Sequence, residues 1–187
     1  YGKEENVMNN HDILHPSVRG CLEYLNITEG VDIHHNGDLP ARSGLGSSSS
    51  FTVGLLHALY SLRKQMRSSR QLAEEAIDVE QNLMNESVGV QDQIMAAHGG
   101  FRIIKLGPDV NWNIVNMLLP SEYTNSLGNH VLLGFSGLSR TAEQHAKKKV
   151  ENIKQGKTID ELQSIKAIAE EALQAFQKQA GFDEIGQ

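Results

Sequence analysis

A glycine- and serine-rich segment holds the residues best suited to binding a phosphate. Residues 44–50 read Gly-Leu-Gly-Ser-Ser-Ser-Ser, and apolar residues at helical spacing follow from Phe51 to Leu62. Glycine lets the backbone turn sharply and approach a ligand closely, while serine caps a helix whose first free N–H groups attract an anion. The segment therefore predicts a phosphate-binding loop. The alternative is a flexible turn with an ordinary serine N-cap, and a Walker A loop is excluded because no Gly-Lys-Ser/Thr follows.

Glu80 is the second candidate because of its place on a predicted helix. In the pattern of residues 69–84, Glu80 lies on or beside the apolar stripe, unlike Glu74 and Asp78. A carboxylate there is costly unless it meets a cation or hydrogen-bond donors, and Mg²⁺ prefers carboxylate oxygen. Glu80 is therefore a candidate metal ligand. A glutamate that reaches solvent from the edge of the stripe, or a buried salt bridge, would explain the same position.

Asp92 is the third candidate. It stands between two amides in the segment Gly89-Val90-Gln91-Asp92-Gln93. An acid that hydrogen bonds can orient is suited to act as the general base for a hydroxyl. The alternative is an aspartate at the start of a helix, where the helix dipole favours it.

Basic groups that could hold an anionic substrate are Arg42, beside the glycine segment, and Arg140, at the end of a predicted strand. Either could clamp a phosphate, although each taken singly is typical of a surface arginine. The eight histidines show no metal-binding spacing. His34 and His35 are adjacent on a predicted strand and so face opposite sides. A serine hydrolase is disfavoured because the Gly-x-Ser-x-Gly elbow is absent.

Helices and a few strands must position these residues. The apolar patterns and glycine or proline breaks predict helices over residues 16–25, 51–62, 69–84, 139–155 and 158–179. They predict strands over residues 31–35, 101–106, 112–119 and 130–135, the middle two as a hairpin and the last largely buried. Because the strands and helices do not alternate strictly, the fold class is α+β.

Composition narrows the function. The 187 residues carry 17 Lys and Arg against 23 Asp and Glu, a net charge of −6, which argues against a nucleic-acid partner. Cys21 is the only cysteine, so we expect no disulfide and a reducing, cytoplasmic location. No run approaches the roughly 18–20 apolar residues of a membrane span, and we expect neither a membrane association nor a signal peptide.

Four segments in the right order resemble the GHMP kinases (galactokinase, homoserine kinase, mevalonate kinase, phosphomevalonate kinase). Residues 38–49 resemble the second motif of that family, and Glu80 and Asp92 match its Mg²⁺-binding Glu and catalytic Asp in order and approximate spacing. Residues 89–93 look like the Gly-x-x-Asp-Gln segment of the sugar-kinase branch. Residues 133–140 resemble the Thr-Gly-x-Ser-Arg segment of heptose 7-phosphate kinases and their fucokinase-like relatives.

The resemblance implies a GHMP kinase fold, incomplete at both ends. Residues 1–135 would form most of the ATP-binding and catalytic domain, which is like domain 2 of ribosomal protein S5. Residues 136–187 would form a helical connection and the start of a ferredoxin-like C-terminal domain. The family's first motif would precede Tyr1 and its third would follow Gln187. We therefore expect the central piece of a longer kinase, one that turns over poorly by itself.

The resemblance also implies roles for residues. Asp92 would be the catalytic base, and Mg²⁺ would be held by Glu80 with Ser48 or its neighbour Ser47. The ATP phosphates would be bound by the loop residues Pro40, Ser43, Gly44, Leu45, Gly46, Ser47, Ser48 and Ser49. The sugar would be bound by Arg42, Gln91, Gly137 and Arg140. Relatives usually carry a small residue where Arg42 stands, so the outer edge of the loop is expected to contact something different.

The implied reaction transfers the γ-phosphoryl group of ATP to the anomeric hydroxyl of D-glycero-D-manno-heptose 7-phosphate, toward nucleotide-activated heptose for surface polysaccharide. The partners would be ATP, Mg²⁺ and the sugar phosphate, with a homodimer as a candidate assembly. Two alternatives stay open: another sugar 1-kinase, fucokinase-like or galactokinase-like, and a non-catalytic sugar- and ATP-binding regulator on the same fold. A purely structural α+β domain would leave the joint presence of loop, Glu and Asp unexplained.

Overall fold

The computed structural model describes residues 4–37, 44–107, 111–134 and 150–186. These residues fall into two compact units, one ending at Gly100 and the other beginning at Phe101. Each unit is considered by itself. In both, helices predominate, and the strands described form one two-stranded sheet, which is compatible with the α+β class.

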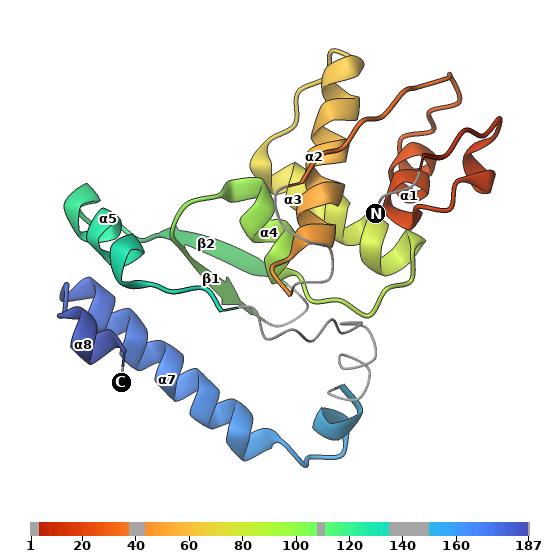
Figure 1. Ribbon diagram of the computed structural model, residues 1–187. Coiled ribbons are helices and arrows are strands. Elements are labelled where there is room, and N and C mark those ends of the chain that lie inside the picture. The colour runs from red at the N-terminus through yellow and green to blue at the C-terminus, as the bar shows by residue number, and fades with distance from the viewer. Residues whose placement is uncertain (1–3, 38–43, 108–110, 135–149, 187) are drawn as a thin grey trace. The chain divides into compact units, whose positions relative to one another are not determined.

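The first unit is helical (Figure 1). Its elements are η1 (Asn10–Asp12), α1 (Pro16–Tyr24), α2 (Ser47–Leu62), α3 (Ser69–Asp78), the π-helical segment η2 (Val79–Leu83) and α4 (Gln91–His98). Helix α2 packs against α1, α3 and α4, and α1 also packs against η2. The core between them is made by the buried residues Cys21, Leu22, Leu25, Ile27, Val53, Leu55, Leu56, Leu59, Tyr60, Leu72, Ala76 and Val79.

Helix α1 begins where the sequence predicts. Pro16 stands in the first turn, where its missing N–H leaves no acceptor unsatisfied. The Nδ1 atom of His15 accepts a hydrogen bond from the Val18 amide at 3.4 Å. Gly20 lets α1 approach η2 closely, because a Cβ there would lie 3.2 Å from side-chain atoms of Val79 and Met84.

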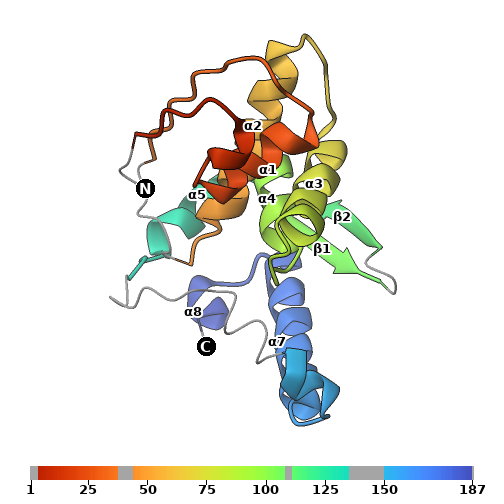
Figure 2. The ribbon, with the colours of Figure 1, turned by 90° about the vertical axis from the view of Figure 1, so that its right-hand side faces the viewer.

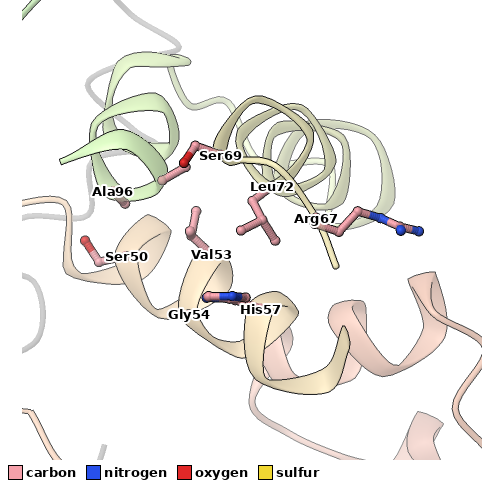
Figure 3. Close-up of a pocket in the computed structure, with 9 residues that line it drawn as sticks. Ser50, Val53, Gly54, His57, Arg67, Ser69, Leu72 and Ala96 are labelled. Atoms are coloured by element: carbon pink, nitrogen blue, oxygen red, sulfur yellow. The ribbon is translucent and has the colours of Figure 1, made fainter. Parts of the chain in front are cut away.

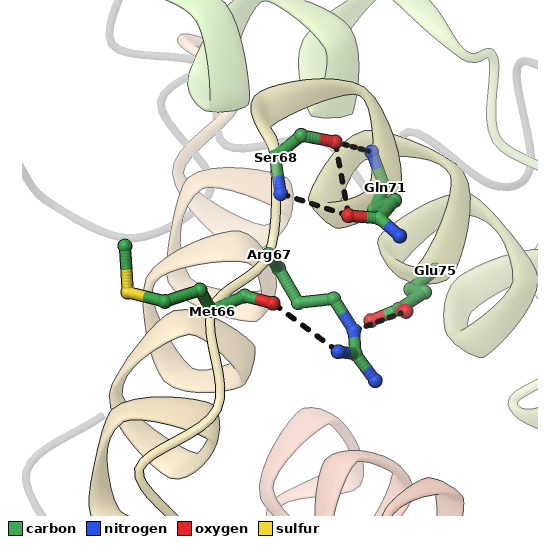
Figure 4. Close-up of polar contacts among 5 residues, drawn as sticks. All are labelled: Met66, Arg67, Ser68, Gln71 and Glu75. Atoms are coloured by element: carbon green, nitrogen blue, oxygen red, sulfur yellow. Dashed lines mark hydrogen bonds and ion pairs between the residues drawn. The ribbon is translucent and has the colours of Figure 1, made fainter.

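A capping box begins α3 (Figure 4). The Gln71 amide donates to the Ser68 hydroxyl at 3.3 Å, and the Ser68 amide donates to Oε1 of Gln71 at 2.9 Å. Next to it, Arg67 forms an ion pair with Glu75 at 3.1 Å and lies over the ring of Tyr60. These contacts fix the turn that leads from α2 into the helix carrying Glu80.

The second unit contains the predicted hairpin (Figure 2). Strands β1 (Arg102–Leu106) and β2 (Trp112–Asn116) pair antiparallel, with Ile104 opposite Ile114. The helices of this unit include α5 (Ser121–His130), α7 (Ile159–Gln177) and α8 (Phe182–Ile185). The Tyr123 hydroxyl donates to the Ala180 carbonyl at 2.7 Å, which links α5 to the segment between α7 and α8.

Most of the predicted helices are confirmed. Helices α1 and α7 lie where residues 16–25 and 158–179 predict them, and α2 begins four residues earlier than Phe51, at Ser47. The predicted helix over residues 69–84 ends in the π-helical segment η2. Of the predicted helix over residues 139–155, residues 139–149 lie outside the described part of the chain, and residues 150–154 are helical.

Two predicted strands are wrong. Residues 31–35 have no strand assignment, and residues 131–134 follow α5 without forming one. The latter were expected to be largely buried, but Val131, Leu132 and Leu133 are all exposed. A short apolar run becomes a strand only when a neighbouring strand pairs with its backbone, and a local pattern does not show whether one does.

Candidate functional site

The start of α2 is shaped by Gly46. Its φ of 68° is left-handed, and its carbonyl accepts the first helical hydrogen bond, from the Ser50 amide at 2.9 Å. Gly46 is thus the N-cap, and no side chain caps the helix. The expectation that serines cap the helix is therefore wrong. Because the first N–H groups of a helix have no intrahelical acceptor, those of Ser47 and Ser48 can bind an anion, with the helix dipole in favour.

Asp92 lies directly beside this turn. It is exposed, in the first turn of α4. A Cβ built on Gly46 would meet Cγ of Asp92 at 3.2 Å and Oδ2 at 3.3 Å. The structure therefore brings the predicted base against the predicted phosphate loop, although 46 and 92 are far apart in sequence. The helix-start position that offers an alternative explanation for Asp92 is also present, since Asp92 belongs to the first turn of α4.

Glu80 is fully buried, as its place on the apolar stripe predicts. It belongs to η2, the π-helical turn that continues α3, and such turns are frequent at functional sites. Its Oε2 atom accepts a hydrogen bond from Oγ of Ser49 at 2.9 Å and another from Nε2 of Gln93. Its Oε1 atom is also buried and has no hydrogen-bond partner. The explanation by a solvent-reaching glutamate is therefore wrong, and with the residues that the structure describes Glu80 forms no salt bridge.

Ser49, and not Ser48, contacts Glu80. Ser49 is buried in the first turn of α2, whereas Ser48 is exposed. The Ser48 carbonyl accepts a hydrogen bond from the hydroxyl of Thr52, one turn further along the helix. The pairing of Ser48 with Glu80 around a metal stays a prediction.

The residues around Glu80 fit a cation. Within the described residues Oε1 of Glu80 has no donor, and a hard cation would supply the missing partner. Among the described residues, no group of three or more His, Cys, Asp or Glu could hold a metal by itself. A metal here would therefore need oxygen ligands beyond this carboxylate, as Mg²⁺ does when it bridges to substrate phosphates.

The charge of Glu80 also affects the protein core. Burial, and to a smaller extent the nearby charge of Glu80, together raise the pKa of the Cys21 thiol to about 12. Cys21 is fully buried, and its Sγ lies 3.9 Å from the Thr52 carbonyl. The thiol is therefore a protonated part of the core.

Comparison with known proteins identifies a protein family that matches the segment carrying these residues. Residues 16–100 match the sequence profile described as the GHMP kinases N terminal domain. This segment is a GHMP kinase N-terminal domain. It contains α1 to α4 and therefore the whole contact set of Gly46, Ser49, Glu80, Asp92 and Gln93.

One relative of the chain has a named activity. The D-glycero-alpha-D-manno-heptose 7-phosphate kinase of Campylobacter jejuni is 27% identical over 143 residues, which are 75% of this chain and 41% of the relative. The chain thus spans about two fifths of the length of the curated relative that it matches. No solved structure matches the chain. In the described part of the chain, no helix has both the length and the apolar character needed to cross a membrane.

Several predicted site residues are not near these contacts or are not described. Gly44, Leu45 and Gln91 are exposed at the edge of the GHMP domain's loop and at the start of α4. The other predicted site residues, Pro40, Arg42, Ser43, Gly137 and Arg140, lie outside the described residues. Their roles in binding ATP and the sugar stay predictions.

Gln93 is a residue of the GHMP domain whose contact was not predicted from the sequence. From the sequence, hydrogen bonds from the flanking amides are expected to orient Asp92. In the structure, the amide of Gln93 instead donates to Glu80. A signal for this was present, because Val90, Gln93 and Ile94 share the buried side of α4. A glutamine on an apolar helix face needs a buried polar partner.

The GHMP domain also has a cavity of about 290 Å³ between α2, α3 and α4 (Figure 3). Its polar lining includes Ser50 and His57 from α2 and Ser69 from α3, over apolar side chains such as Val53 and Leu72. Neither Gly46, Glu80 nor Asp92 lines it. The cavity is therefore separate from the contact set that joins the loop, the carboxylate and the base.

Proposed function

We propose that the protein containing this GHMP domain is an ATP-dependent sugar kinase that phosphorylates the anomeric hydroxyl of a heptose 7-phosphate. The observation that carries the proposal is the placement of Asp92 against the glycine N-cap of α2. Phosphoryl transfer needs an anion cradle and a base within reach of the same phosphate, and positioning with charge neutralisation supplies most of its acceleration. The named activity of the Campylobacter jejuni relative supports the choice of sugar.

In the proposed reaction, the free N–H groups at the start of α2 bind phosphate oxygens of ATP. Asp92 accepts the proton of the sugar hydroxyl. The hydroxyl oxygen forms a bond to the γ-phosphorus while the bond from that phosphorus to the bridging oxygen breaks, and ADP leaves with the electron pair. Mg²⁺, when bound by Glu80 with a hydroxyl of Ser47 or Ser48, would neutralise phosphate charge.

The test is a coupled ADP-release assay of the native protein on D-glycero-D-manno-heptose 7-phosphate, fucose and galactose. We expect turnover on the sugar phosphate. Turnover restricted to fucose or galactose would replace the heptose proposal with the corresponding sugar 1-kinase. ATP binding without ADP release on any sugar would favour the non-catalytic regulator.

Asp92→Asn is the decisive variant. Because an amide cannot accept the proton at neutral pH, we expect turnover to be lost while ATP still binds. Asp160→Asn is the matched control, since Asp160 is an exposed aspartate in the first turn of α7. If Asp92 only stabilises the start of its helix, both variants will keep full turnover, and Asp92 is not the base.

A further inference from the structure

Gln93 is an uncharged side chain with no exposed surface. Its Nε2 donates to Oε2 of Glu80, and its own Oε1 is buried without a hydrogen-bond partner. Burying an amide that is only half satisfied is unfavourable. The contact with Glu80 is thus the feature that explains why an amide stands on the buried side of α4.

Two donors meet on one oxygen of Glu80. Ser49 reaches Oε2 from the first turn of α2, and Gln93 reaches the same atom from the first turn of α4. Oε1 has no hydrogen-bond partner in the part of the chain that the structure describes. A carboxylate held in this way cannot rotate freely, because rotation would break both hydrogen bonds. The two helices therefore determine which oxygen of Glu80 remains available.

We infer that Gln93, with Ser49, is a positioning residue that presents Oε1 of Glu80 to the metal ion of the kinase. The inference rests on the proposed function. Residues that hydrogen-bond a metal ligand orient it and raise its affinity, although they do not touch the metal. Because Gln93 follows Asp92 directly on α4, one helical turn holds the base toward the loop and orients the metal ligand. That turn would keep the distance between the base and the metal ion constant.

A merely structural role for Gln93 makes a different prediction. Satisfying a buried carboxylate would affect the free energy of unfolding and leave the affinity for Mg²⁺ unchanged. Gln93→Met separates the two roles, since methionine keeps the length and the unbranched methylene stem of the side chain but lacks the donor. Ser49→Ala removes the second donor with a smaller change in volume.

The experiment titrates Mg²⁺ calorimetrically into the native protein saturated with ADP. We expect the dissociation constant for Mg²⁺ to rise about tenfold in Gln93→Met and in Ser49→Ala, the range typical of residues that orient metal ligands. Glu80→Gln is expected to weaken Mg²⁺ more than either. Affinity for ADP without Mg²⁺ should stay the same in Gln93→Met, because Gln93 is not among the predicted phosphate-binding residues. At saturating Mg²⁺, turnover of Gln93→Met should recover, because Asp92 is unchanged.

The matched control is Ser50→Ala. Ser50 is the next serine of α2 and is exposed, and it is expected to leave Mg²⁺ binding unchanged. The inference is overturned if Gln93→Met and Ser49→Ala bind Mg²⁺ like the wild type while Glu80→Gln does not, an outcome that leaves the proposed kinase intact. If Gln93→Met does not fold, Ser49→Ala alone decides. Wild-type protein that binds no Mg²⁺ with ADP present would overturn the metal role of Glu80 itself.

Discussion

Gly46 satisfies two conditions that no other residue type meets together. Its φ of 68° is favoured by glycine, and Cγ of Asp92 lies only 3.2 Å from the place where a Cβ would stand. The pattern of glycines and serines predicts a sharp turn here. It does not predict which glycine must stay bare because a distant carboxylate lies against it.

Substituting Gly46 tests this contact. In Gly46→Ala we expect a loss of about 1–2 kcal/mol from the left-handed backbone, with a further loss because the methyl group displaces Asp92. Gly44→Ala is the matched variant, since Gly44 has a φ of 79° but nothing within 4 Å of its Cβ position. Urea unfolding of both variants measures the difference. Equal losses would mean that the Asp92 side chain does not press on the loop.

Glu80 and Gln93 differ in how far sequence could predict them. Helical periodicity places Glu80 on or beside the apolar stripe, and the structure shows that it is fully buried. The partner of Gln93 does not follow from its neighbours, because the contact joins α4 to η2 across the core. The only local indication that the Gln93 amide is buried is that its neighbours at helical spacing, Val90 and Ile94, are apolar.

At the scale of elements, the backbone changes from α-helical in α3 to π-helical in η2, although the apolar pattern of the sequence continues through both. The predicted helix over residues 69–84 is present, but its last part is π-helical. A π-helical turn widens the backbone by one residue and rotates the side chains that follow. Hydrophobic spacing does not reveal this, because it places Leu83 and Met84 together on the stripe, whereas Met84 packs against the core and Leu83 is exposed.

The start of α3 can be tested by removing its cap. Ser68→Ala deletes the acceptor for the Gln71 amide, and we expect the free energy of unfolding to fall by about 1 kcal/mol. Ser69→Ala, one residue later and exposed, should stay within about 0.5 kcal/mol of the wild type. Thermal and urea unfolding give both values. Similar losses in the two variants would show that the capping box does not stabilise this helix.

The failed strands have a common cause. Residues 31–35 and 130–135 contain apolar residues that fit a strand, yet no described strand pairs with either. The hairpin of β1 and β2 was predictable because a local turn signal at residues 107–109 joins two runs that pair with each other. Strand prediction succeeded where pairing was local.

At the scale of the whole chain, burial is uneven. Of the described residues, Trp112 is the only buried hydrophobic residue after Gly100, and α5, α7 and α8 contain no buried residues. The core that holds Glu80 belongs to the first unit. Local stability should follow this difference, because helices gain most of their stability from packing.

Hydrogen exchange should reveal the difference. In this chain we expect the amides of α7 to exchange faster than those of Leu56 and Leu59 in α2, whose side chains are buried. Exchange followed by mass spectrometry on peptides from each helix measures both. Protection of α7 equal to that of α2 would contradict the expectation and show that another surface covers α7.

The sequence alone predicted the helix-starting glycine loop, a carboxylate on or beside the apolar stripe and the acid at residue 92, because the residues that define a loop, a helix stripe or a helix start lie close together along the chain. Only the tertiary structure decided that Gly46 stays bare against Asp92, and that Ser49 and Gln93 meet on one oxygen of Glu80. Glu80 is 31 positions from Ser49 and 13 positions from Gln93 along the chain. These contacts depend on how α2, η2 and α4 pack, and packing is settled by side chains from the whole core rather than by any one segment.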